Sequence, residues 1–153
     1  MKKWFIMLLA LVLLLPAGCG NVAGKSSQSE SQQDEWGITL SAEDVTPIGM
    51  TLVCTQSGGK FKGELQTGTP FFLERFVEGE WLPVSSKPEE EVAWTMIALG
   101  IQPNNTTKWK VDWEFLYGYL EPDTYRMAKE IMDLRSPGKY TEKTYYVEFA
   151  IEY

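Results

Sequence analysis

The chain has 153 residues, and its 21 acidic side chains outnumber its 14 basic ones. Without Lys2 and Lys3, 12 basic residues face the 21 acidic ones, so the chain from Cys19 onward carries a net charge of −9. This excess argues against a nucleic-acid partner, because binding of phosphates needs a basic surface. The sequence contains no histidine, which excludes histidine-dependent nucleophile pairs and the commonest zinc ligand.

The first 18 residues are predicted to be a signal peptide. Lys2 and Lys3 precede an uninterrupted apolar run from Trp4 to Leu15. This run is shorter than the about 20 residues that a membrane-spanning helix needs, but it suits the core of a signal peptide. The following Leu-Pro-Ala-Gly-Cys19 resembles the bacterial lipobox, although proline stands where leucine is more usual. We therefore expect Cys19 to be lipidated, with simple cleavage and secretion, or an uncleaved anchor, as alternatives.

The expected lipid would hold the mature chain at the extracytoplasmic face of the cell membrane. Residues 19–35 then form the lipidated cysteine and a disordered spacer, because they are rich in serine and glutamine and contain no aromatic residue. Such a composition buries too little apolar surface to offset the entropy lost on ordering. Residues 36–153 hold all 18 aromatic residues outside the signal peptide, and we expect them to form one domain with one core.

Strands are predicted in this domain wherever apolar and polar residues alternate, because alternate side chains of a strand point to opposite faces. The dipeptide Glu78-Gly79 predicts a tight hairpin between two of the strands. In the strand that begins at Trp109, we expect Trp113 and Phe115 to share the apolar face. In chain order the predicted strands cover residues 38–40, 50–55, 71–77, 80–82, 109–115 and 145–153.

The segment from Tyr125 to Arg135 fits two patterns. Its apolar residues also follow a helical stripe, and its methionine, alanine, lysine and glutamate content favours a helix. The preceding residues 120–125 look like a tyrosine corner, in which a tyrosine at the start of a strand hydrogen-bonds to upstream backbone in a Greek-key sandwich. We therefore predict a strand over residues 124–133. Short strands separated by turns predict an all-β fold, an antiparallel sandwich or barrel.

A set of short motifs is spread over the whole of residues 36–153. They are Gly37-Ile38-Thr39-Leu40, Asp44-Val45-Thr46-Pro47, Gly49-Met50-Thr51-Leu52, Gly63-Glu64-Leu65-Gln66-Thr67-Gly68, Phe72-Leu73-Glu74, Glu80-Trp81, Trp113 with Leu116-Tyr117-Gly118, Thr124-Tyr125-Arg126, Lys129-Glu130-Ile131-Met132-Asp133, and Tyr145-Tyr146 with Glu148-Phe149. Together they resemble a bacterial immunoglobulin-like domain family found in exported proteins and lipoproteins of Gram-positive gut bacteria. The resemblance implies an immunoglobulin-like β-sandwich outside the cytoplasm and brings no catalytic or ligand-binding residues. The chain departs from the pattern at Asp123, where glycine is more usual.

Few residues of the chain suit catalysis or metal binding. Cys54 has no partner for an intrachain disulfide once Cys19 is lipidated, and its place in the pattern predicts a buried side chain. Glu89-Glu90-Glu91 lacks the spacing of a calcium loop and is interpreted as a solvated loop. Asp112 and Glu114 are expected side by side on the polar face of a strand, as a surface charge cluster rather than an acid pair. We therefore expect no catalytic residue, no metal and no cofactor.

Aromatic residues are the candidate contact residues. Phe72, Phe76 and Tyr146 lie out of phase with the predicted core residues of their strands, so we expect these rings to point outward. Outward rings could stack on a glycan or anchor a protein partner. The alternatives are that loops cover them, or that the phase is reversed and they form the core. Tyr117 and Tyr119 are either contacts at a loop tip or packed within a turn.

These observations favour a lipid-anchored extracytoplasmic binding or accessory module without catalytic activity. Its partner would be a cell-envelope component, protein or glycan, or another exported protein. One alternative is a regulatory ectodomain that partners a membrane sensor. A remote alternative is a carboxylate-based hydrolase, which would need two acidic groups facing each other about 5 to 10 Å apart.

Overall fold

The computed structural model describes residues 34–87, 94–95 and 97–152. The expected signal peptide, Cys19 and Glu89-Glu90-Glu91 lie outside the described residues. No helix in the described part of the chain is long and apolar enough to cross a membrane. In chain order the elements are β1 (Ile38–Thr46), β2 (Gly49–Gln56), β3 (Glu64–Thr67), β4 (Phe72–Val77), β5 (Glu80–Pro83), β6 (Leu99–Gly100), β7 (Asn105–Asp112), α1 (Glu114–Tyr117), β8 (Asp123–Ser136) and β9 (Lys139–Ile151).

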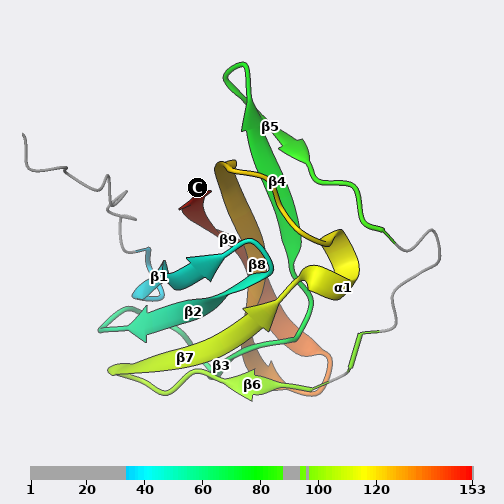
Figure 1. Cartoon of the computed structure of the whole chain (residues 1–153). Coiled ribbons are helices and arrows are strands. Elements are labelled where there is room, and N and C mark those ends of the chain that lie inside the picture. Colours follow the sequence, from blue (N-terminus) through cyan, green and yellow to red (C-terminus); the bar gives the residue numbers. More distant parts are fainter. Residues whose placement is uncertain (1–33, 88–93, 96, 153) are drawn as a thin grey trace, which may run out of the picture.

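Two antiparallel sheets form the layers of a sandwich, which confirms the predicted all-β fold (Figure 1). In the smaller sheet β2 lies between β1 and β7. In the larger sheet the 14-residue strand β8 pairs with β9 along one edge, and with β4 and then β3 along its other edge. β5 extends this sheet beyond β4, and β6 extends it beyond β3. The larger sheet is therefore organised around β8.

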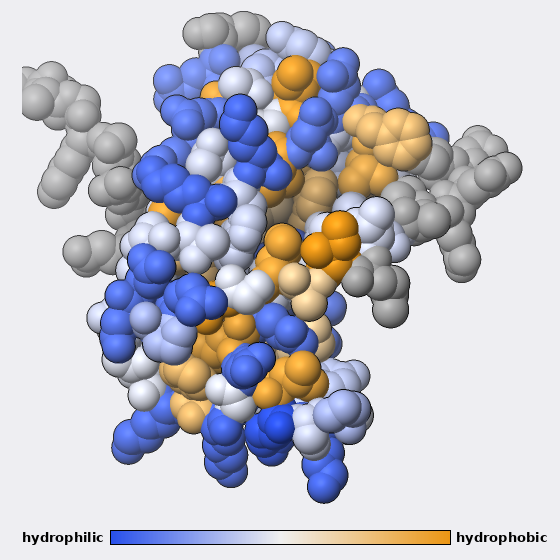
Figure 2. Space-filling model, turned by 90° about the horizontal axis from the view of Figure 1, so that it is seen from below, coloured by the Kyte–Doolittle hydropathy of each residue, from blue (hydrophilic) through white to orange (hydrophobic). Residues whose placement is uncertain are grey.

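The core lies between the two sheets and contains aliphatic and aromatic side chains from both. Cys54, Trp113 and Met127 are completely buried within it. The predicted burial of Cys54 is thus confirmed, and burial raises the pKa of its thiol to about 12, so the thiol stays protonated and unreactive at neutral pH. Seen from below, the end of the sandwich near β6 shows apolar groups in separate patches between hydrophilic side chains (Figure 2).

The strand predicted over residues 124–133 is confirmed as part of β8. Tyr125, Met127 and Ile131 are at most 3 % exposed and point into the core, so burial follows the period of a strand rather than that of a helix. The hydroxyl of Tyr125 donates a hydrogen bond to the carbonyl of Glu121 at 2.8 Å. This is the bond expected of a tyrosine corner, and it fixes the turn into β8.

The prediction of one strand over residues 109–115 is wrong at its end. β7 ends at Asp112, whose carboxylate accepts a hydrogen bond from the backbone N–H of Glu114 at 2.9 Å. The chain then enters the short helix α1, which leaves Trp113 in the core and turns Phe115 outward, 77 % exposed. Asp112 and Glu114 therefore do not project side by side from a strand, because a local side-chain hydrogen bond ends the strand between them.

A buried lysine joins β8 to the connection between β3 and β4. Lys129 is 5 % exposed, and its Nζ donates hydrogen bonds to the carbonyls of Gly68 at 2.6 Å and Pro70 at 2.9 Å. These carbonyls lie beside the part of β8 that falls between its pairing with β4 and its pairing with β3. Burial lowers the pKa of Lys129 to about 8, an effect that the charge of Glu130 partly offsets. The charged form of Lys129 is therefore less favourable in the folded protein than in the unfolded chain.

We expect the Lys129→Met variant to change how stability depends on pH. The pKa of Lys129 is lower in the folded than in the unfolded chain, so the unfolded chain binds more protons, and stability rises as pH increases above about 8. Between about pH 7.5 and pH 9 the native protein should gain about 1 kcal/mol of unfolding free energy relative to the variant. Urea denaturation followed by circular dichroism measures this difference, and a constant difference would contradict it.

Candidate functional site

The outer faces of the two sheets differ in chemistry. On the smaller sheet, the outer face is formed mainly by threonine, serine and charged side chains. Thr55 and Thr106 share a hydrogen bond of 3.0 Å there, and Lys108 pairs with Glu43 at 2.6 Å. The polar groups of this face bond to one another or are open to solvent. The smaller sheet therefore presents an ordinary polar surface.

The larger sheet presents aromatic rings to solvent instead. Phe72 and Phe76 of β4 are 57 % and 42 % exposed, and Tyr146 of β9 is 46 % exposed. Trp81 of β5 lies opposite Phe76 in the hairpin, with 4.9 Å between the ring centroids. We call these four residues, together with Arg126 of β8, the aromatic face. The outward orientation predicted for Phe72, Phe76 and Tyr146 is what the structure has.

Arg126 connects the rings across the sheet. Its guanidinium carbon lies 4.6 Å from the ring centroid of Trp81 and 4.2 Å from that of Tyr146. Glu74, opposite Arg126 in the β4–β8 register, pairs with the same guanidinium group. Both charged side chains are only 22 % exposed. The cation–π contacts and the ion pair hold Trp81 and Tyr146 in place on the outer side of the sheet.

A groove of about 350 Å³ runs beside Phe72. Its polar side chains include the carboxylates of Glu74 and Glu130 and the hydroxyl of Thr144. This volume is within the range of small-ligand sites, and the mixture of rings with a few polar groups is typical of them. The remaining lining residues are Pro70, Leu73, Pro83, Val84, Tyr117, Ala128 and Tyr146.

The other two candidate tyrosines differ in their relation to the groove. Tyr117 at the end of α1 is half-buried, packs against Phe71 with 6.2 Å between ring centroids, and lines the groove together with Phe72 and Tyr146. Burial raises the pKa of its hydroxyl, an effect that a hydrogen bond with the backbone of Leu73 partly offsets. Tyr119 is 70 % exposed and does not line the groove. The structure therefore does not bring all five candidate residues together.

Sequence reasoning missed Trp81, Arg126 and Glu74 as members of this surface. The signal for Trp81 was present, because a two-residue turn at Glu78-Gly79 places it opposite Phe76. The sequence indicates the positions of Arg126 and Glu74 less directly. Whether these two residues meet depends on which strand lies beside β8, and a single sequence does not specify that neighbour.

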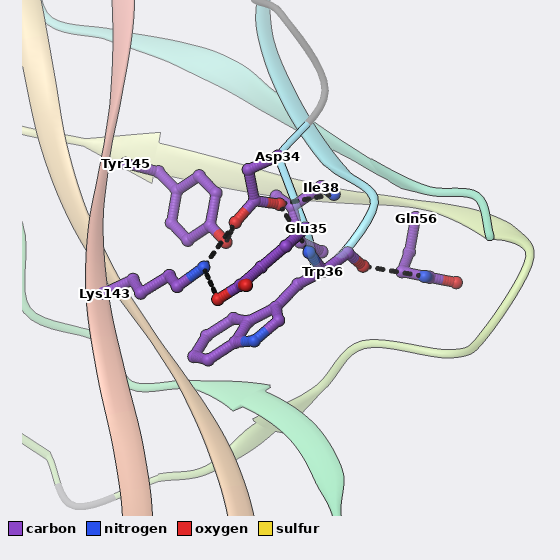
Figure 3. Close-up of polar contacts among 7 residues, drawn as sticks. All are labelled: Asp34, Glu35, Trp36, Ile38, Gln56, Lys143 and Tyr145. Carbon is purple, nitrogen blue, oxygen red and sulfur yellow. Dashed lines mark hydrogen bonds and ion pairs between the residues drawn. The ribbon is translucent and has the colours of Figure 1, made fainter. Parts of the chain in front are cut away.

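A second group of polar contacts joins the start of the domain to β9 (Figure 3). The carboxylate of Asp34 accepts hydrogen bonds from the backbone N–H groups of Trp36 at 3.0 Å and Ile38 at 3.2 Å. It also accepts bonds from the Tyr145 hydroxyl at 2.6 Å and the Lys143 ammonium at 2.9 Å. We call this arrangement the N-terminal clamp. It ties Asp34 and Glu35, which precede the predicted start of the domain at residue 36, to β9.

Lys143 completes the clamp from β9. Its Nζ pairs with Glu35 at 2.7 Å and lies 4.4 Å from the ring centroid of Trp36. Burial alone would raise the pKa of Asp34, but the bonds from Tyr145, Lys143 and the Ile38 backbone outweigh it and lower that pKa. Burial, and then the bond to Asp34, raise the pKa of the Tyr145 hydroxyl. The clamp is therefore formed with Asp34 ionised.

We expect the Asp34→Asn variant to be less stable than the native chain by about 1 kcal/mol near neutral pH, because the charge-assisted bonds to β9 are lost. The lowered pKa of Asp34 means that this stabilisation is present above its ordinary pKa and is lost as pH falls through the folded value. The two proteins should therefore converge in strong acid. Urea unfolding at neutral and acidic pH tests this, with Glu35→Gln as a control that should differ little, since Glu35 is exposed.

In the described residues no group of three or more cysteine, aspartate or glutamate side chains is placed to hold a metal ion. Residues 33–150 match the sequence model of a family described as bacterial Ig-like domain. Comparisons with curated proteins and with solved structures gave no match. The family match covers every strand that the structure describes except the last residue of β9.

Proposed function

Because the chain belongs to the bacterial Ig-like domain family, we propose that it is a non-catalytic binding module that a lipid on Cys19 holds at the extracytoplasmic face of the cell membrane. The sequence of the first 19 residues supports the anchor. The family supports a binding or accessory role. Function in such a fold has to be argued from a site, and among the described residues the aromatic face is the strongest candidate.

We propose that the aromatic face is the contact surface for a cell-envelope component or another exported protein. The observation that supports this most directly is the exposure of Phe72, Phe76 and Tyr146 on one side of one sheet. Large rings exposed together bury much apolar area on binding and are over-represented among residues that dominate binding energy. The groove beside Phe72 adds a concave feature to this surface.

The groove supports binding better than hydrolysis. Its two carboxylates are Glu74 and Glu130. Glu74 lies opposite Arg126 and pairs with its guanidinium group. Hydrolysis of a glycoside uses two carboxylates that are free to transfer a proton or to attack the sugar, whereas the carboxylate of Glu74 is engaged with Arg126. A regulatory ectodomain that contacts a membrane sensor would use the aromatic face equally well.

We expect Phe72→Ala to reduce the recovery of the partner about tenfold when the tagged full chain is pulled down from solubilised membranes of the source bacterium, because an exposed anchor ring is lost. Phe115→Ala is the matched control, since Phe115 is exposed but lies on α1. One stoichiometric membrane protein in the native sample would identify a regulator, whereas a glycan or exported protein would identify a binding module. Equal recovery by all three chains would contradict the proposed surface.

The proposed anchor has a direct test of its own. In the source bacterium the native protein should be found in the membrane fraction, and mass spectrometry of its mature N-terminus should find acyl chains on Cys19. Cys19→Ser should abolish the modification, while Cys54→Ala removes the other cysteine and should leave it unchanged. A native chain with an unmodified mature terminus would refute the anchor without affecting the contact surface.

A further inference from the structure

The charges on the aromatic face are unbalanced. By the alternation of side chains, the outer side of β4, β8 and β9, on which the aromatic face lies, carries Glu74, Glu130, Glu142 and Glu148 but, among the described residues, one basic residue, Arg126. Arg126 is neutralised by Glu74. Glu130 and Glu148 are exposed and form no ion pair with any residue that the structure describes. The face therefore carries negative charge in excess, as does the whole chain.

The rings of this face already hold one cation. The guanidinium group of Arg126 lies over the faces of Trp81 and Tyr146 at distances typical of cation–π contacts. Phe72 lies next to this arrangement, since it pairs with Ala128 in β8, which in turn pairs with Tyr146. The groove beside Phe72 contains Glu130. An aromatic floor with an unpaired carboxylate at its side is a suitable site for a second cation.

We propose that the aromatic face binds a lysine- or arginine-bearing segment of a polypeptide, an inference that rests on the proposed contact surface and names its partner. The aliphatic part of a basic side chain packs on Phe72 and Tyr146, and its charge lies near Glu130, which lines the groove beside Phe72. Anionic polymers and anionic lipid headgroups do not fit, because the net charge of −9 repels them. A neutral glycan would leave the Glu130 carboxylate without a counter-charge.

The test is a titration of the isotope-labelled full chain, followed by NMR, in a polyoxyethylene detergent that carries neither charge nor sugar. The probes are a short peptide of alternating lysine and serine, the same peptide with glutamate in place of lysine, and a neutral chitin oligosaccharide. We expect the lysine peptide alone to shift amide signals of β4, β8 and β9. Binding should weaken as salt is added, because the carboxylates are exposed.

Matched variants separate a specific site from general attraction between opposite charges. Phe72→Ala should weaken binding of the lysine peptide about tenfold, and Glu130→Gln about threefold. Glu114→Gln removes the same charge from α1 and should leave the affinity unchanged. Equal affinity of Glu130→Gln and Glu114→Gln, or lack of binding, would overturn the proposal.

The two proposals fail in different ways. Binding of the oligosaccharide with loss in Phe72→Ala would overturn the basic segment as partner and leave the contact surface intact. A membrane pull-down that is insensitive to Phe72→Ala would overturn the contact surface itself. Binding of the lysine peptide at signals outside β4, β8 and β9 would overturn both the partner and its place on the molecule.

Discussion

The larger sheet depends on the alternation of side chains along β8. Residues such as Tyr125, Met127 and Ile131 point into the core, whereas Arg126 and Ala128 point to the opposite side. A slip of one residue would exchange the two sets and place charged groups between the sheets. Pairing with β9 along one edge, and with β4 and β3 along the other, prevents that slip. One register therefore determines both the core and the surface where the rings lie.

The sequence predicted the parts of this fold that depend on local periodicity. Alternating burial predicts β9 and the outward rings of β4 because side-chain direction in a strand follows from position alone. The same alternation wrongly predicted that Phe115 lies in the strand and faces the core, because a hydrogen bond between Asp112 and Glu114 ends β7 before it. It did not predict that Arg126 lies between Trp81 and Tyr146, because those three residues come from three strands whose order is a property of the whole sheet.

Two buried polar residues of β8 stabilise the region where its neighbouring strand changes from β4 to β3. Lys129 donates hydrogen bonds to carbonyls of the connection between β3 and β4. Asp133 accepts hydrogen bonds from the N–H groups of Lys62 at 3.0 Å and Gly63 at 2.6 Å, just before β3. Each satisfies backbone groups that the strand ladder leaves unpaired. The alternation along β8 puts both residues on the core side, and the connections on either side of β3 supply the backbone groups that they bind.

The N-terminal clamp determines how the domain would bear a load. Asp34 is the first residue that the structure describes, and its carboxylate bonds to backbone at the start of β1 and to two side chains of β9, so tension applied at this residue would reach both strands. The first and the last strand of the domain are thus coupled at the point where force is applied. Several bonds must break together before β1 can peel from β2, so a domain attached by its N-terminus resists mechanical unravelling from that end.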